Sequence, residues 1–223
     1  TFDNYRTGLQ RCQCVARIGR ELARGDGTGF LLRGSDLSAK LTADPVLITN
    51  CHVIDPSGNG EGLHPDEVVI SFQALDGVAA DQPFTVKQVL WSSPPDQLDA
   101  TIVTLNTPVP LTAPFPLAKT LPLRGARVIV LGHPGGGTLS FSIADNQLLD
   151  YEDSGFRLHY RTPTEGGSSG SPVFNQEWRL IGLHHAGGDA LARLNGQAGT
   201  YQANEGIRFE NIRAAFDAQY KGT

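Results

Sequence analysis

A segment rich in glycine and serine, residues 165–174 (Glu-Gly-Gly-Ser-Ser-Gly-Ser-Pro-Val-Phe), holds the side chains best suited to covalent chemistry. It packs three glycines and three serines into six residues before the chain turns apolar at Val173. Glycines let backbone N–H groups approach a ligand closely, so a serine among them can be exposed beside convergent donors. An acyl-transfer enzyme needs such a nucleophile, with donors aimed where the carbonyl oxygen becomes an anion. An ordinary Gly/Ser loop has the same composition.

Two apolar runs upstream contain the other groups that a serine nucleophile needs. Residues 46–54 predict a strand that delivers His52, and residues 98–105 place Asp99 at the head of an apolar run. A serine hydroxyl is a poor nucleophile at neutral pH without a base, and an imidazole with an ordinary pKa of about 6.5 suits proton exchange there. His52, Asp99 and Ser169 are therefore the candidate catalytic residues.

The chain resembles the chymotrypsin-like (trypsin-fold) serine peptidases in these three motifs. The family has a threonine followed by histidine after a strand, a D-x-A-I-V-like segment and G-x-S-G-[GS]-P; this sequence has T-N-C-H, D-A-T-I-V and G-S-S-G-S-P. The nearest look is to the bacterial glutamyl endopeptidases, whose members read G-x-S-G-S-P-V-F. The resemblance covers most of the chain, from about Val15 onward.

The resemblance implies a serine endopeptidase that works through an acyl-enzyme. Ser169 would attack the scissile carbonyl, His52 would carry the proton, and Asp99 would hold the imidazole tautomer and stabilise the imidazolium. The N–H groups of Gly167 and Ser169 are the expected oxyanion hole, because glycine at 167 permits the required turn. Asp96 is the substitute acid if Asp99 only caps its strand.

Two alternative interpretations of the sequence assign a different nucleophile or none. Residues 166–170 also fit the G-x-S-x-G elbow of the α/β-hydrolases, with Ser168 as nucleophile and the glycines after His133 as an oxyanion loop. A helix must follow that elbow, whereas residues 172–174 predict a strand, and the order serine, acid, histidine fails. The other alternative is a catalytically weak protease-like domain that binds peptides or scaffolds a complex; the intact set of three residues argues against it.

The resemblance also places the residues that select the substrate. Trypsin-type enzymes carry an aspartate six residues before the nucleophile, and Pro163 at this place argues against Arg or Lys specificity. Glutamyl endopeptidases use a threonine five residues before the nucleophile and a histidine in G-[IL]-H, which correspond to Thr164 and His184 and imply cleavage after Glu. Glu165 and Asp189 are acidic and could instead recruit a basic side chain. The expected pocket walls are residues 163–166, 185–187 and 199–201, and the predicted substrate-binding residues are Thr164, His184, His185, Gly187 and Gly199.

Composition narrows the classes of partner. The net charge of −5 disfavours nucleic acid, no apolar run approaches the ~18 residues of a membrane span, and no signal peptide is visible. No Cys/His spacing suggests zinc, and no glycine motif fits a phosphate. We therefore expect a peptide or protein substrate, with no cofactor, no metal, no nucleic acid and no membrane partner.

The cysteine content and the first residue bear on compartment and chain length. Three cysteines form no legible disulfide framework, which favours a cytoplasmic location. The sequence starts at Thr1 and contains no Met, so we expect a processed chain or a piece of a longer protein with further domains.

Short strands with frequent Gly, Pro and Asp-Gly turns predict an all-β protein. Five prolines between Pro108 and Pro122 cannot build a ladder and predict an extended connector. Ile212, Ala215 and Phe216 share one face of an expected helix. Together with the resemblance, this predicts two six-stranded antiparallel β-barrels of the trypsin fold with a C-terminal α-helix, in one domain over 1–223: a barrel at about 15–107, a connector at 108–122, a barrel at about 123–208 and a helix at about 210–220.

Overall fold

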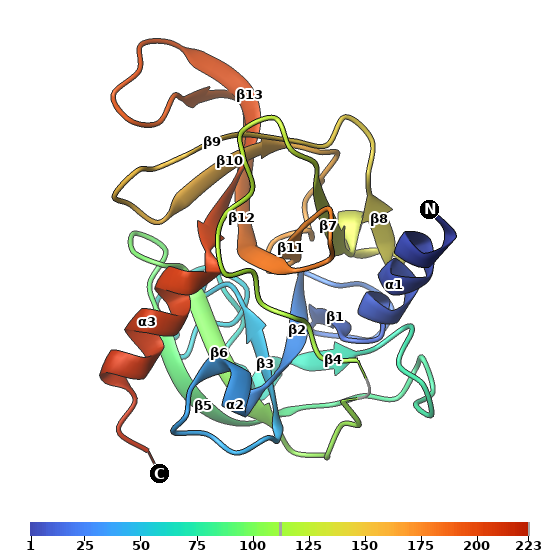
Figure 1. The fold of residues 1–223 in the computed structure, drawn as a ribbon. Coiled ribbons are helices and arrows are strands. Elements are labelled where there is room, and N and C mark those ends of the chain that lie inside the picture. The colour runs from blue at the N-terminus through green and yellow to red at the C-terminus, as the bar shows by residue number, and fades with distance from the viewer. Residues whose placement is uncertain (112, 223) are drawn as a thin grey trace.

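A computed structural model describes residues 1–111 and 113–222, which fold into two antiparallel sheets flanked by helices (Figure 1). The first sheet has six strands in the order β4-β1-β2-β3-β6-β5. Phe84, just before the last of these, bridges Ile70 in the first, which brings the two edges of the sheet together. Its strands are β1 (Val15–Gly19), β2 (Gly27–Arg33), β3 (Pro45–Thr49), β4 (Val69–Ser71), β5 (Val86–Ser93) and β6 (Ala100–Leu105).

The second sheet has seven strands in the order β8-β7-β11-β12-β13-β10-β9. Its own core consists of branched aliphatic side chains around the buried ring of Tyr160. Its strands are β7 (Val128–Gly132), β8 (Ser140–Ser142), β9 (Gln147–Tyr151), β10 (Arg157–Arg161), β11 (Pro172–Asn175), β12 (Leu180–Ala192) and β13 (Thr200–Arg208).

The two sheets share a continuous hydrophobic core. Strand β2 is buried along nearly its whole length, and Phe30 within it contacts Phe115 of the connector at a ring-centroid distance of 5.6 Å. Phe115 in turn packs edge-on against Phe174 of β11 at 4.8 Å. Aromatic pairs of this kind add to the free energy gained by burying their area, so the connector holds the two sheets together.

Each of the two long helices packs against the sheet that the other half of the chain forms. Helix α1 (Phe2–Cys12) lies beside the second sheet, and Gly8 approaches Trp178 and Phe141 there. Helix α3 (Phe209–Gln219) follows β13 but packs on the first sheet, where Phe216 meets Trp91 edge-on. Figure 1 shows the two helices on opposite sides of the molecule. The short helices are α2 (Gly34–Leu37) and the 3₁₀ helices η1 (Pro65–Glu67) and η2 (Pro134–Gly136).

The predicted fold class is confirmed, with two differences of detail. The second sheet has seven strands instead of six. The strand predicted over 46–54 ends at Thr49, because the carbonyl of Asn50 accepts the N–H groups of both Val53 and Ile54 and closes a turn. His52 therefore lies on a turn instead of in a strand. Within the described residues, no helix has the length and apolar character to cross a membrane.

Candidate active site

The serine-rich segment forms a tight turn that enters β11, and hydrogen bonds fix it to both sheets. Gly167 and Gly170 both have left-handed backbone conformations, with φ of 88° and 87°, which glycine adopts without strain. The carbonyl of Ser169 accepts from Thr28 N of β2 at 2.8 Å, and Gly170 N donates to the carbonyl of His184 at 2.9 Å. The turn therefore bridges the first sheet and β12 and holds Ser169 between them.

Two backbone donors beside Ser169 are free. Across the described parts of the chain, no acceptor is bonded to the N–H of Gly167 or to that of Ser169. A Cβ at position 167 would lie 2.5 Å from Gly136 N and 2.7 Å from His133 O, so only glycine fits there. Unpaired N–H groups beside a serine hydroxyl are donors of the kind that can stabilise an oxyanion.

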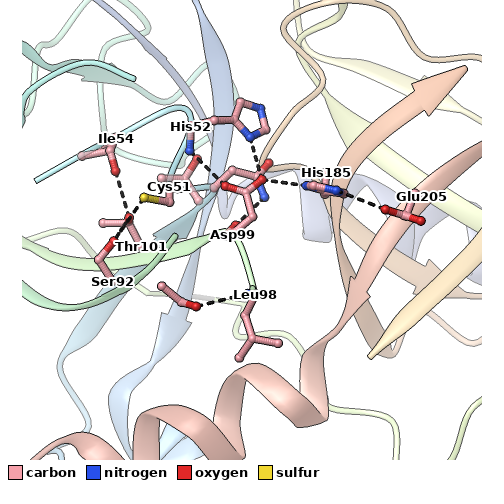
Figure 2. A network of polar contacts seen from close by, with 12 residues as sticks. Cys51, His52, Ile54, Ser92, Leu98, Asp99, Thr101, His185 and Glu205 are labelled. Carbon is pink, nitrogen blue, oxygen red and sulfur yellow. Dashed lines mark hydrogen bonds and ion pairs between the residues drawn. The ribbon is translucent and has the colours of Figure 1, made fainter. Parts of the chain in front are cut away.

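His52 and Asp99 are in direct contact, as their motifs predict (Figure 2). The ring Nδ1 of His52 lies 2.6 Å from Asp99 Oδ2, and the backbone N–H of His52 donates to Oδ1 at 3.0 Å. The Asp99 side chain is fully buried, whereas that of His52 is 33% exposed. Asp96, the alternative acid, is exposed in the turn before Asp99. Asp99 is thus the residue that orients this imidazole.

The conformation and charge of Asp99 are both set by its neighbours. Its backbone has φ of 41°, a left-handed value that aspartate tolerates better than most residues, and Asn50 Nδ2 donates to its carbonyl at 2.8 Å. Burial alone would raise the pKa of Asp99, but hydrogen bonds from His185 and His52 outweigh burial and hold this pKa below its usual range. Asp99 is therefore a carboxylate at neutral pH.

The Ser169 turn lies beside the end of β3 that leads to His52. Thr49 Oγ1 donates to the carbonyl of Thr28 at 2.7 Å, and Thr28 N donates to the carbonyl of Ser169. Among the described residues, no hydrogen bond joins the His52 ring to the Ser169 hydroxyl. Such bonds are often long in substrate-free enzymes and tighten when substrate binds. Both side chains are partly exposed on this face of the protein.

Ser168, the alternative nucleophile, is poorly placed for attack. Only 3% of its surface is exposed, and its hydroxyl accepts from the backbone N–H of Glu165 at 3.3 Å within the same turn. The segment that follows is strand β11 and not a helix. The geometry required of a nucleophile elbow is absent from residues 165–175.

A cavity of about 580 Å³ opens next to Ser169 between three segments. Three of the predicted substrate-binding residues line it: Thr164, His184 and Gly187. The third wall consists of residues 202–204 and not 199–201, because Gly187 pairs across the β12–β13 ladder with Asn204. Gly199 therefore lies outside the lining.

Hydrogen bonds fix the polar groups of this cavity. Tyr160 and His184 bond through the hydroxyl and Nδ1 at 2.7 Å, in a fully buried contact. Burial lowers the pKa of His184 to about 3, so the ring is neutral. Thr164 donates its hydroxyl to Asn204 Oδ1 at 2.7 Å, while Asn204 Nδ2 donates to the carbonyl of Thr162. Sequence reasoning missed Tyr160 and Asn204, although a buried tyrosine hydroxyl or amide on a strand signals a polar partner.

His185, also predicted to bind substrate, points away from the cavity. Its Nδ1 lies 2.7 Å from Asp99 Oδ2, the same oxygen that contacts His52. Each of the three residues His52, Asp99 and His185 offers one atom that could ligate a metal ion, and these atoms lie within 4.8 Å of one another. Hydrogen bonds from two ring N–H groups to one carboxylate oxygen account for the arrangement.

The two-sheet fold, with a buried aspartate bonded to a partly exposed histidine beside a glycine-lined serine turn, has the architecture of the trypsin class. The family described as the trypsin-like peptidase domain matches residues 27–183, and the chain belongs to this family.

Solved structures agree on the fold. The Rv3671c protease of M. tuberculosis in its active form has a TM-score of 0.64 and 21% identity, over 97% of this chain and 85% of that chain. Its inactive form has a TM-score of 0.64 and 20% identity, over 97% of this chain and 93% of that chain. Among curated proteins, the uncharacterized protein y4fB of Sinorhizobium fredii is 29% identical in a match that covers 81% of this chain. This chain spans only 28% of the length of that relative.

Proposed function

We propose that this protein is a serine endopeptidase in which Ser169 is the nucleophile, His52 the general base and Asp99 the residue that orients the base. The observation that carries the proposal is the 2.6 Å contact between His52 Nδ1 and the buried carboxylate of Asp99. A carboxylate on Nδ1 leaves Nε2 as the free basic atom of the ring. The other ring nitrogen can then take a proton from a nucleophile.

The proposed reaction follows from these positions. Ser169 Oγ attacks the carbonyl carbon of the substrate and gives its proton to His52 Nε2. The oxygen of the tetrahedral intermediate accepts from the free N–H groups of Gly167 and Ser169. His52 then protonates the leaving amine, which leaves an ester on Ser169 that water cleaves by the same steps.

Cysteine chemistry is not supported as an alternative. Cys51 is next to His52 in sequence, but its thiol is buried and accepts from Ser92 Oγ at 3.4 Å. Burial raises the pKa of Cys51, which disfavours the thiolate that a cysteine nucleophile requires.

A fluorophosphonate probe tests the proposed function. We expect the probe to label the native protein once, and digestion with mass spectrometry to place the adduct on Ser169, because the proposed mechanism gives that hydroxyl a base and an oxyanion hole. Heat-unfolded protein is the control and should not react. A folded protein that stays unlabelled would favour the alternative of a peptide-binding or scaffold domain.

We further propose that the cavity accepts a substrate side chain with an oxygen acceptor at P1, the residue before the cleaved bond. His184 Nδ1 lies 2.7 Å from the buried Tyr160 hydroxyl, and we assign the hydroxyl as the donor because a buried O–H needs an acceptor. The neutral ring of His184 then carries its proton on Nε2 and can donate it to the substrate. By resemblance to glutamyl endopeptidases, the expected residue is Glu. The chemistry of the cavity favours the uncharged amide of Gln.

Three features of the cavity support Gln over Glu. His184 is neutral, so it provides a donor but no positive charge. Thr164 uses its proton on Asn204 and offers the cavity only an acceptor, which matches an amide N–H and not a carboxylate. Glu165 and Asp189 add negative charge to the lining. Among the described residues that line the cavity, Arg161 is the one lysine or arginine, and it is paired with Asp145 at 3.1 Å.

A pair of peptides that differ only in Gln or Glu at P1 tests this preference. We expect kcat/KM to be about 10-fold higher for Gln at pH 7.5, because the Glu carboxylate would have no cation to pair with. The difference should narrow toward pH 5 as the substrate carboxyl becomes protonated. Faster cleavage after Glu at pH 7.5 would contradict the Gln preference and support the glutamyl endopeptidase resemblance.

A further inference from the structure

The carboxylate of Asp99 is shared between two histidines that come from different sheets. His52 follows β3 of the first sheet, and His185 lies in β12 of the second. Both Nδ1 atoms approach Asp99 Oδ2, at 2.6 and 2.7 Å, from different directions (Figure 2). Since a carboxylate oxygen only accepts, both ring nitrogens must carry a proton.

Behind His185, a second carboxylate extends the hydrogen-bonded chain. His185 Nε2 lies 3.2 Å from Glu205 Oε1 in β13, as Figure 2 also shows. The other oxygen of Glu205 contacts His159 Nε2 at 2.8 Å, and His159 Nδ1 contacts the hydroxyl of Tyr201 at 2.8 Å. Four side chains of the second sheet, those of His185, Glu205, His159 and Tyr201, are thus connected to the pair formed by His52 and Asp99.

The geometry determines the charge of His185. Both of its ring nitrogens face carboxylate oxygens, so both donate and the ring is an imidazolium. Burial would lower the pKa of His185, but its hydrogen bonds to Asp99 and Glu205 outweigh burial and raise the pKa to about 9. For Glu205, hydrogen bonds from His159 and His185 outweigh burial and lower the pKa to about 2.

We propose that His185 and Glu205 are positioning residues whose ion pair sets the pH range in which His52 is a free base. This inference rests on the proposed function. The positive ring of His185 donates to the same carboxylate as His52. It therefore reduces the electrostatic stabilisation that Asp99 gives to a protonated His52. Glu205 restores part of that stabilisation. The carboxylates of Asp99 and Glu205 together with the cation of His185 have one net negative charge, which favours a protonated His52.

Other titratable and charged groups lie near this chain of side chains. His184 precedes His185 and is neutral. Arg157 Nε lies 3.8 Å from Glu205 Oε1, in a pair that is partly exposed. Because these groups are neutral or remote from Asp99, the charges on His185 and Glu205 are the ones expected to act on His52.

Two substitutions that should shift the titration midpoint of the His52 ring in opposite directions test the proposal. In His185→Asn the amide can still donate to Asp99 but carries no charge, and we expect the titration midpoint of the His52 ring to rise by about one pH unit. This is the effect of a unit charge at the ring-centroid distance of 6.3 Å for an effective dielectric constant of roughly 40. In Glu205→Gln the midpoint should fall by a smaller amount, because Glu205 lies behind His185.

The midpoints are measured by NMR on protein with ¹⁵N-labelled histidine, so the readout does not depend on catalysis. The acidic limb of the kcat/KM profile should move in the same direction as each midpoint. His64→Asn is the matched control, because His64 is an exposed histidine paired with Asp66 and has no link to Asp99. Its substitution should leave the His52 midpoint unchanged.

Each outcome bears on one of the two proposals. Midpoints that stay within about 0.2 units in both variants, or that move in the same direction, would overturn the role of the ion pair. If one variant does not fold, the sign of the shift in the other decides. A protein with the expected shifts but no hydrolysis would instead overturn the proposed function, and hydrolysis without the shifts would leave that function standing.

Discussion

Replacing Ser169 with alanine is expected to reduce kcat for peptide hydrolysis by on the order of 10⁶-fold. Without the hydroxyl no acyl-enzyme forms, and the remaining rate comes only from substrate binding and the oxyanion hole. KM should change little, because the small side chain of Ser169 contributes little to the proposed substrate cavity. Steady-state kinetics with the Gln peptide, together with fluorophosphonate labelling, measure both effects.

Ser168→Ala is the matched control for this substitution. Its hydroxyl accepts one backbone hydrogen bond inside the turn, and losing it should cost about 1 kcal/mol of stability. Activity should stay within tenfold of the unmodified protein. If labelling survived in Ser169→Ala and disappeared in Ser168→Ala, the nucleophile would be Ser168 and our assignment would be wrong.

The second large effect is expected from Gly170→Ala, which should destabilise the protein by more than about 4 kcal/mol or prevent folding. Gly170 has φ of 87°, and an added Cβ would overlap the carbonyl of Thr28 and the hydroxyl of Thr49. Both of those groups belong to strands and cannot move without breaking the hydrogen bond between them. Unfolding in urea, followed by circular dichroism, measures the loss.

Gly166→Ala is the control that shows whether Gly170→Ala destabilises the protein through crowding at position 170 or because the turn tolerates no added side chain. A Cβ at Gly166 would have no atom within 4 Å, and this residue has no positive φ. We expect its unfolding free energy to stay within about 0.5 kcal/mol of the original. Equal destabilisation by the two substitutions would show that packing against Thr28 and Thr49 is not the cause.

The family resemblance implied the contact between His52 and Asp99. The sequence alone predicted the all-β fold class, because short apolar runs and turn residues are local signals. It did not predict helix α1. That helix buries the small residues Gly8 and Cys12 and leaves Phe2 and Tyr5 exposed, so its apolar side chains do not mark the buried face. Helical periodicity, which depends on an apolar buried face, therefore gave no signal.

The cavity was only partly predictable because it depends on strand register. Neighbouring residues of a strand point to opposite faces, so His184 lines the cavity while His185 reaches Asp99. The ladder between β12 and β13 shifts register twice, and motif spacing cannot reveal such shifts. Asn204 lies opposite Gly187, whereas motif alignment assigned that wall of the cavity to residues 199–201.

The packing of α3 affects how the chain can fold during synthesis. A ribosome makes α3 after both sheets, yet Phe216 fills a site against Trp91, and Asp217 accepts from Ser38. Lys40 also donates to backbone carbonyls of α3. While α3 is still inside the exit tunnel, the first sheet therefore has an uncovered aromatic surface. We expect a nascent chain arrested before residue 209 to be far more sensitive to proteolysis than one that includes this helix.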